Sequence, residues 1–151
     1  MQFAASGVEP MRIVLDTNVT VSGLLWGGPP RQILEAARAE QLELFTSPAL
    51  HAELAEVLAR PRFARRFVDL QTDPTELLLG FAALAAIVLP EQIEPVVVAD
   101  PDDDMVIACA LKAGADIIVS GDHHLLDLKM YQKIPILDSR FFVEEYLREA
   151  Q

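Results

Sequence analysis

The segment MRIVLDTN, residues 11–18, contains a short apolar run that ends on an aspartate. The run IVL has no polar interruption, as expected of a parallel strand that helices cover on both faces. Two further runs share this pattern, VVVA at residues 96–99 and IIV at residues 117–119. We therefore expect all three runs to be strands of one central parallel sheet with helices on both sides.

Working outward from these runs, the chain alternates strand-like stretches with longer segments of helical periodicity, which indicates βαβ units. The expected strands are residues 12–15, 44–46, 96–99, 117–119 and 134–137. The expected helices are residues 30–40, 48–59, 103–113 and 139–149. Between residues 60 and 89 we expect no strand, but two helices over 63–70 and 75–88 that stand off the sheet as an arm. The predicted fold is α/β, a three-layer α/β/α sandwich with a central parallel sheet and a helical arm.

Length and composition indicate a single folded domain. The chain has 151 residues, within the ~100–200 residues typical of one domain, and its hydrophobic share of 52% is too high for a disordered chain. Residues 1–10 show no periodicity, so we treat them as an N-terminal extension and residues 11–151 as the domain. No apolar run reaches the ~18 residues of a membrane span, and no export signal is evident. Because Cys109 is the only cysteine, we exclude a disulfide framework and expect a cytoplasmic protein.

The net charge of the chain argues against a broad nucleic-acid-binding surface. Twelve basic residues against 23 acidic residues give a formal net charge of −11. Proteins that hold nucleic acid through a wide positive surface have the opposite balance. An anionic substrate would therefore have to be attracted locally, by metal ions or by a small basic patch.

Acidic side chains lie where several expected strands end. Asp16 follows IVL, Asp122 follows IIV after two residues, and Asp104 lies in the first turns of the helix after VVVA. Glu53 lies at the border of the apolar stripe of the helix over residues 48–59. Because the active crevice of an open parallel sheet lies beyond the carboxyl ends of its strands, all four residues map to one edge.

Each of these acids has an ordinary structural interpretation. Asp16 could belong to a turn, Asp122 to a loop, and Glu53 to a solvated helix face. The aspartates at positions 100, 102 and 103 suit the N-terminus of a helix, which leaves Asp104 without a capping role. The convergence of the four acids on one edge favours a functional interpretation over these separate ones.

Four carboxylates that lie close together need a compensating charge. Two like charges ~5 Å apart repel by roughly 3 kcal/mol at an effective dielectric near 20, so the cluster would raise its own pKa values or recruit a cation. Carboxylates without a histidine or cysteine cluster favour Mg²⁺ or Mn²⁺. The chemistry that this site implies is metal-assisted attack of water on a phosphodiester.

Four motifs carry a resemblance to a known family: LDTNV, the SPALHAEL helix, DPDDDMVIACALKAGADIIVSGD and the closing IPILDSRFF. In order and setting they resemble the PIN-domain ribonucleases, above all the toxin components of toxin–antitoxin pairs. The resemblance implies that Asp16, Glu53, Asp104 and Asp122 bind metal and that Asn18 and Ser120 orient them. It further implies an RNA substrate, products with a 5′-phosphate and a 3′-hydroxyl, and an inhibiting antitoxin protein. His123 and His124 depart from the family, where many members have charged or small residues. They could touch substrate or be solvated loop residues.

Outside the acids, one basic cluster stands out, inside ARPRFARRF at the start of the expected arm. Arg62, Arg65 and Arg66, with the neighbouring Arg60, could present guanidinium groups to RNA phosphates or could form a solvated helix face. Trp26 in LLWGGPP could stack a base at the mouth of the crevice or face a partner.

Two other functions are compatible with an acid at the end of the first strand. An aspartyl-phosphate phosphatase would need a second aspartate two residues after the first, where this chain has Asn18. A non-catalytic module with the same fold could instead capture a basic peptide in its acidic pocket. We also expect a homodimer, for which Phe141, Phe142 and Tyr146 offer an apolar C-terminal surface, unless they form a C-terminal helix that closes the core.

Overall fold

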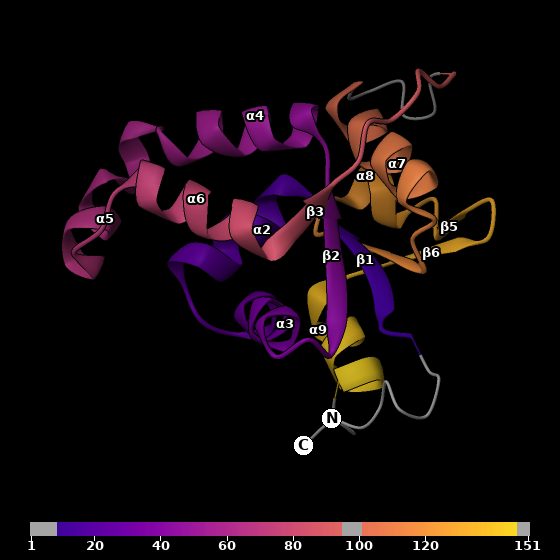
Figure 1. Ribbon diagram of the computed structural model, residues 1–151, viewed down its shortest axis with the longest axis horizontal. Coiled ribbons are helices and arrows are strands. Elements are labelled where there is room, and N and C mark those ends of the chain that lie inside the picture. The colour runs from indigo at the N-terminus through magenta and orange to yellow at the C-terminus, as the bar shows by residue number, and fades with distance from the viewer. Residues whose placement is uncertain (1–8, 95–100, 148–151) are drawn as a thin grey trace.

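The computed structural model describes residues 9–94 and 101–147 of the chain, residues 101 and 102 by their backbone alone. A sheet runs through its middle, and within the described residues the strand order is β3-β2-β1-β4-β6-β5 (Figure 1). The strands are β1 (Met11–Leu15), β2 (Leu42–Thr46), β3 (Ala85–Ile87), β4 (Ile117–Val119), β5 (Met130–Tyr131) and β6 (Ile134–Leu137). All neighbouring strands pair in parallel except β5, which is antiparallel to β6.

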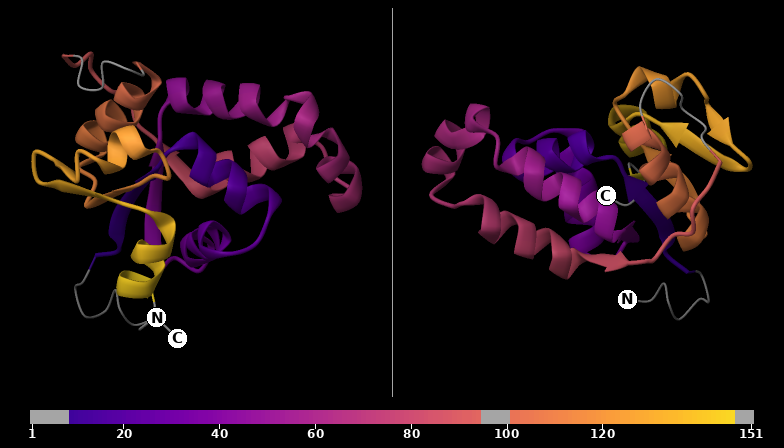
Figure 2. Two further views of the ribbon diagram at one scale, coloured as in Figure 1. Left: turned by 180° about the vertical axis from the view of Figure 1, so that it is seen from behind. Right: turned by 90° about the horizontal axis from the view of Figure 1, so that it is seen from above.

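Helices cover both faces of this sheet, as predicted. The helices are α2 (Thr17–Leu25), α3 (Pro29–Arg38), α4 (Pro48–Leu58), α5 (Ala64–Leu70), α6 (Pro74–Leu84), α7 (Pro101–Ala113), α8 (His123–Leu126) and α9 (Ser139–Phe142). A 3₁₀ turn, η1 (Pro61–Phe63), precedes α5, and a π-helical turn, η2 (Val143–Leu147), follows α9. In Figures 1 and 2, α7 and α8 lie on one side of the central strands, and α2, α3, α6 and α9 lie on the other. The three-layer α/β/α prediction is therefore confirmed.

The side chains of the central strands alternate between two apolar clusters, one for each face of the sheet. Ile13 and Leu15 of β1 belong to the cluster under α2, α3, α4 and α6, whereas Val14 belongs to the cluster under α7. The strand β4 repeats this alternation. Both faces are buried because successive residues of a strand point to opposite sides and each side meets a helix layer.

Two elements near the start and the middle of the chain differ from the expectations. Helix α2 begins immediately after Asp16, where a turn was the structural alternative, and it packs closely on α3. A Cβ added at Gly23 would lie 2.8 Å from Leu34 Cδ1 and 2.9 Å from the Pro30 carbonyl oxygen, so this contact requires glycine. The prediction that residues 60–89 contain no strand is wrong, because Ala85–Ile87 form β3 at the edge of the sheet.

The arm consists of α5 and α6 and projects away from the strands at one end of the molecule (Figures 1 and 2). It begins after α4 and returns to the sheet through β3, which pairs with β2. Phe63, Phe67 and Phe81 are buried and join the apolar cluster of α2 and α4. The arm is thus anchored at its base by three phenylalanines.

Parts of the expectations lie outside the described residues. These are the strand over residues 96–99, the cap at residue 100 and the end of the helix expected to reach residue 149. Within the described part of the chain, no helix is long and apolar enough to span a bilayer.

Candidate metal centre

Asp16 occupies the junction between β1 and α2 and is almost fully buried, with 6% of its surface exposed. One carboxylate oxygen accepts a hydrogen bond from the Val19 N–H at 2.9 Å, which caps α2, and the other accepts from the Ser120 hydroxyl. Burial raises the pKa of the Asp16 carboxyl above its ordinary value, and the nearby Asp122 carboxylate adds to the shift, whereas these hydrogen bonds oppose it. In the protein alone, the charged form of Asp16 is therefore disfavoured.

Ser120 connects the two carboxylates that follow neighbouring strands. Its hydroxyl donates to Asp16 and accepts from the Asp122 N–H at 3.0 Å. The Asp122 side chain in turn caps the short helix α8 by accepting from the His124 N–H at 2.8 Å. Because the backbone of Ser120 is fixed by β6 through a 2.9 Å hydrogen bond to the Leu137 carbonyl, the orientation of both acids depends on the sheet.

On α7, the structure places Asp103 in the pocket, one position before the predicted Asp104. Asp103 is 7% exposed and shares the buried face of α7 with Val106, Ile107 and Ala110, which follow at helical spacing. Asp104 is half-buried and is not among the described residues that line the pocket. A ligand role for Asp104 remains a prediction, and Asp103 is the residue of α7 that geometry favours.

Glu53 enters the site from α4 on the opposite side. Its carboxylate accepts a hydrogen bond from the hydroxyl of Thr17, the residue that follows Asp16. The sequence analysis did not identify Thr17. Its hydroxyl ties α4 to the start of α2, so the position of Glu53 is coupled to the position of Asp16.

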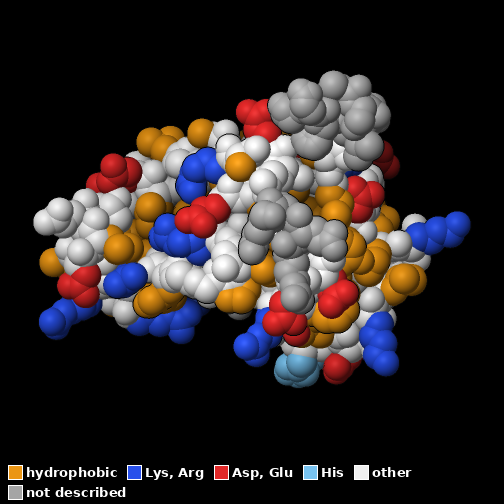
Figure 3. Space-filling model, turned by 90° about the horizontal axis from the view of Figure 1, so that it is seen from below, with side chains coloured by type: hydrophobic (Ala, Val, Ile, Leu, Met, Phe, Trp, Pro, Cys, Tyr) orange, Lys and Arg blue, Asp and Glu red, His pale blue; other side chains and the backbone are white. Residues whose placement is uncertain are grey.

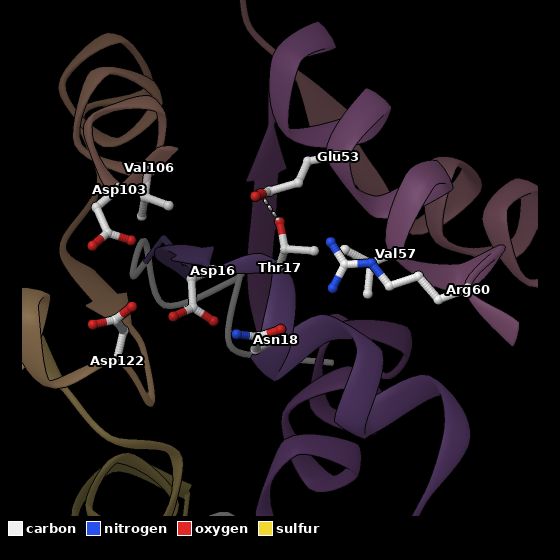
Figure 4. A pocket seen from close by; sticks show the side chains of 9 residues that line it. All are labelled: Asp16, Thr17, Asn18, Glu53, Val57, Arg60, Asp103, Val106 and Asp122. Carbon is white, nitrogen blue, oxygen red and sulfur yellow. Dashed lines mark hydrogen bonds between the residues drawn. The ribbon is translucent and has the colours of Figure 1, made fainter. Parts of the chain in front are cut away.

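These side chains line one small pocket at the carboxyl edge of the sheet (Figure 4). In Figure 4, Asp16 lies between Asp103 and Asp122 on one side and Thr17 and Glu53 on the other. The cavity has a volume of about 130 Å³, and its lining residues are Asp16, Thr17, Asn18, Glu53, Val57, Arg60, Asp103, Val106 and Asp122. We call it the acidic pocket. It brings together three of the four predicted acids and the predicted neighbour Asn18, while Ser120 lies behind Asp16.

The donor set of the acidic pocket fits a divalent cation. Ligand atoms of Asp103, Asp122 and His124 all lie within 4.8 Å of one another, a spacing that a single ion can bridge. The buried Asp16 carboxylate lies beside them, and because burial raises its pKa, a bound cation would favour its charged form. Carboxylate oxygens favour Mg²⁺ or Mn²⁺, while the imidazole of His124 adds a ligand that softer metals also accept.

With this geometry established, the chain can be compared with known proteins. The family model described as PIN domain matches residues 12–124, which is most of the chain and includes every acid of the pocket. The chain belongs to the PIN-domain family. No curated protein sequence matches it. Membership indicates a nuclease-type fold, and the acidic pocket of this PIN domain fits the metal binding that such a fold uses.

The predicted basic cluster surrounds the base of the arm of this PIN domain. Arg62 and Arg65 are exposed, and the Arg62 guanidinium lies 4.7 Å from the centre of the Phe63 ring. Arg66 is half-buried, and its Nε donates to the Leu25 carbonyl at 2.7 Å. Arg66 therefore also stabilises the C-terminus of α2. On the face seen in Figure 3, Lys and Arg side chains recur over the half that carries the arm.

Arg60, which the sequence placed in the same cluster, reaches the acidic pocket itself. Its guanidinium lies 3.9 Å from the Glu56 carboxylate, one helical turn earlier. The side chain is 48% exposed, so it can meet an incoming phosphate at the rim.

The C-terminal aromatic residues are not one exposed surface. Phe142 is fully buried in the core under α3, and Phe141 and Tyr146 are exposed. The expectation that Phe142 contributes to a self-association surface is therefore wrong.

Proposed function

We propose that this PIN domain is a metal-dependent endoribonuclease that hydrolyses RNA phosphodiester bonds and acts as the toxin of a toxin–antitoxin pair. The observation that carries the proposal is the acidic pocket, in which Asp16, Glu53, Asp103 and Asp122 converge at the carboxyl edge of the sheet. Membership of a family with a nuclease-type fold supports the same reaction class.

In this proposal, different residues of the pocket bind the ion and the substrate. Asp16, Asp103 and Asp122 would hold Mg²⁺ or Mn²⁺, with Glu53 on the far side of the pocket. The bound ion would supply Lewis acidity toward the phosphoryl oxygens and lower the pKa of a water molecule. Ser120 and Thr17 keep the carboxylates in place through the hydrogen bonds described above. Arg60 at the rim would donate a charge-assisted hydrogen bond to the scissile phosphate.

The toxin assignment rests on the motif resemblance and on the charge of the pocket. An antitoxin could inhibit the enzyme by inserting an arginine or lysine among the carboxylates, in place of the metal charge. The Arg60 guanidinium already lies beside these acids, which supports the idea that the pocket tolerates such a group. The same proposal includes a homodimer, which a measurement of the molar mass in solution would test.

The decisive experiment incubates the purified chain with a pool of cellular RNAs in Mg²⁺ or Mn²⁺, with and without chelator, and maps the new ends. We expect chelator-sensitive cleavage inside RNA chains that leaves 5′-phosphates. No cleavage in either metal, together with tight capture of a basic peptide, would favour the alternative of a non-catalytic binding module. Asp138→Asn is the matched control, because Asp138 also follows a strand and caps a helix but does not line the pocket.

A further inference from the structure

Helix α2 has a single narrow stripe of solvent-facing residues. Asn18 is exposed and Ser22 is half-buried, and the other seven residues of the helix are buried. Trp26 follows at the same spacing of four residues. Its backbone N–H donates to the Ser22 carbonyl at 2.9 Å, which continues the hydrogen-bond pattern of the helix by one residue. Residues four apart lie on one helix face. The stripe therefore begins at Asn18 in the acidic pocket and ends at Trp26.

A second row of residues runs from the pocket to the same tryptophan. It begins with Arg60, which lines the pocket, and continues through Phe63, whose ring centre lies 5.9 Å from that of Trp26 at an interplanar angle of 61°. It ends with Arg66, whose guanidinium lies over one face of the indole ring, 5.5 Å from its centre, so a base would stack on the other face. Two rows on different parts of the chain thus lead from the acids to one aromatic side chain beside a cation.

Trp26 has the properties of a stacking surface rather than of a core residue. It is 42% exposed although it is the largest type of side chain, and a Cβ added at the next residue, Gly27, would meet no atom within 4 Å. Phe63 touches the ring in an edge-type arrangement that does not stack on the indole face. The Arg66 side chain is fixed by its hydrogen bond to Leu25, so the cation is held in place without a ligand.

We propose that Trp26 stacks a base of single-stranded RNA while Arg66 beside it binds the neighbouring phosphate, a few nucleotides away from the acidic pocket. This inference rests on the proposed RNA substrate. Eight residues of helix separate Asn18 from Trp26, a rise of about 12 Å at 1.5 Å per residue. At a rise of ~3.4 Å per stacked nucleotide, this length corresponds to about three to four nucleotides. Trp26 would therefore select for unpaired RNA that extends at least this far from the cleaved bond.

The chemistry of this subsite explains how an acidic protein can hold RNA. Stacking on an indole requires no net positive charge and accepts any base, because every base has an aromatic face. A guanidinium adjacent to the ring adds attraction for one phosphate without a broad positive surface. The competing explanation is a purely structural contact that attaches the arm to α2.

Because Trp26 is the only tryptophan of the chain, its fluorescence reports directly on this subsite. The experiment titrates the wild-type protein, in chelator to prevent cleavage, with an oligouridylate of about eight nucleotides, twice the estimated span. We expect saturable quenching by the single strand and much weaker quenching by the same length of duplex RNA. Unchanged fluorescence at a concentration where filter binding shows saturation would overturn the proposal.

Three variants separate stacking from a structural role. Trp26→Ala should weaken binding of the oligouridylate, measured by filter binding, about 5- to 150-fold, which corresponds to the ~1–3 kcal/mol of one stacked base. Trp26→Phe should recover most of the affinity, because a phenyl ring also stacks. Phe141→Ala is the matched control, since Phe141 is similarly exposed at 48% but lies on α9, away from α2 and the pocket, and this change should leave binding unaltered.

The outcomes also distinguish this inference from the proposed function. Cleavage by Trp26→Ala with an unchanged KM would overturn the stacking subsite and leave the ribonuclease assignment intact. Quenching by single-stranded RNA without cleavage in any metal would support the subsite and remove the ribonuclease assignment. A melting curve of Trp26→Ala identifies a folding defect, in which case the comparison of wild type with Trp26→Phe and the wild-type quenching decide the question.

Discussion

The two sides of the acidic pocket are built in different ways. On the sheet side, Asp16 and Asp103 are nearly buried. Asp16 directly follows β1 and Asp103 lies on α7, and both elements pack in the core. On the arm side, Glu53 and Arg60 come from α4 and the turn after it, where side chains are more exposed. The sheet side is therefore suited to hold an ion in fixed geometry, and the arm side to meet a substrate that varies. The predictions below test this division, beginning with the largest expected effect.

Asp16→Asn should abolish cleavage. Asparagine caps α2 about as well as aspartate does, so the variant keeps the shape and loses the charge that a cation needs. Loss of a residue that only supports a metal ligand costs about 10- to 100-fold in activity, so loss of a ligand should cost at least 100-fold. Initial rates on a labelled RNA measure the effect. If Asp16→Asn were as active as the control Asp138→Asn, Asp16 would not be a ligand of the ion.

Asp103→Asn and Asp104→Asn should differ strongly although the residues are adjacent. Asp103 faces the pocket from the buried side of α7, so its replacement should lower activity by about as much as Asp16→Asn does. Replacing Asp104 should change activity by only about twofold, the scale of a typical surface substitution. Isothermal titration with Mn²⁺ gives a second measurement on both variants. The opposite ranking would restore Asp104 as the ligand on α7.

On the arm side, the double variant Arg62→Ala with Arg65→Ala should raise KM and leave kcat unchanged. Each lost phosphate contact should reduce the slope of log affinity against log salt by about 0.7 for single-stranded RNA. Arg66 is left in place because it also binds the Leu25 carbonyl, and its removal would loosen α2. The matched control is Arg38→Ala with Arg140→Ala, two exposed arginines outside the arm. An unchanged salt dependence would show that Arg62 and Arg65 form only a solvated face.

The smallest effect should be on the stability of the metal-free protein. Burial raises the pKa of Asp16 in the folded state above its ordinary value of 3.8, so the folded state binds the proton more tightly than the unfolded state does. Stability should therefore fall as pH rises from 3.8 through the raised pKa, and Asp16→Asn should escape this loss. At neutral pH we expect the variant to melt a few degrees higher, at ~2–4 °C per kcal/mol. Below pH 3.8 the two melting temperatures should converge, and saturating Mn²⁺ should stabilise only the wild type.

Much of the fold could be predicted because burial leaves a clear trace in sequence. The run IVL within β1 and the run IIV of β4 have no polar residue, and this uniformity is what a strand between two helix layers requires. The strand β3 was missed because Ala85 and Ala86 continue the helical composition of α6 with no turn residue between them. Helix α2 was missed because its valines and threonines are β-branched, and only packing against α3 and α4 overrides that preference.

The residue types of the candidate site could be predicted, but not which residue of α7 faces the pocket. Asp16 could be identified because it directly follows a buried strand. The choice between Asp103 and Asp104 depends on the phase of α7, and the apolar spacing of Val106, Ile107 and Ala110 from Asp103 was the signal that could have decided it. Thr17 could not be found in this way, and His124 stood out only as a departure from the family pattern. The roles of both residues depend on where α4 and α8 lie in space.

The route of the chain through the arm side has a consequence for how such proteins diverge. The segment between β2 and β3 leaves the sheet at Thr46 and rejoins it in the adjacent strand, where Thr46 pairs with Ile87. The segment between α4 and β3 can therefore change without moving β1, β4 or α7, which position the aspartates, provided that the buried contacts of its phenylalanines are kept. If the proposed function holds, a graft of residues 61–84 from another family member should transfer its preference among RNAs to this chain while the carboxylates of the acidic pocket stay where they are. New RNA targets for the proposed activity could then arise by replacing this one segment, with the acidic pocket unchanged.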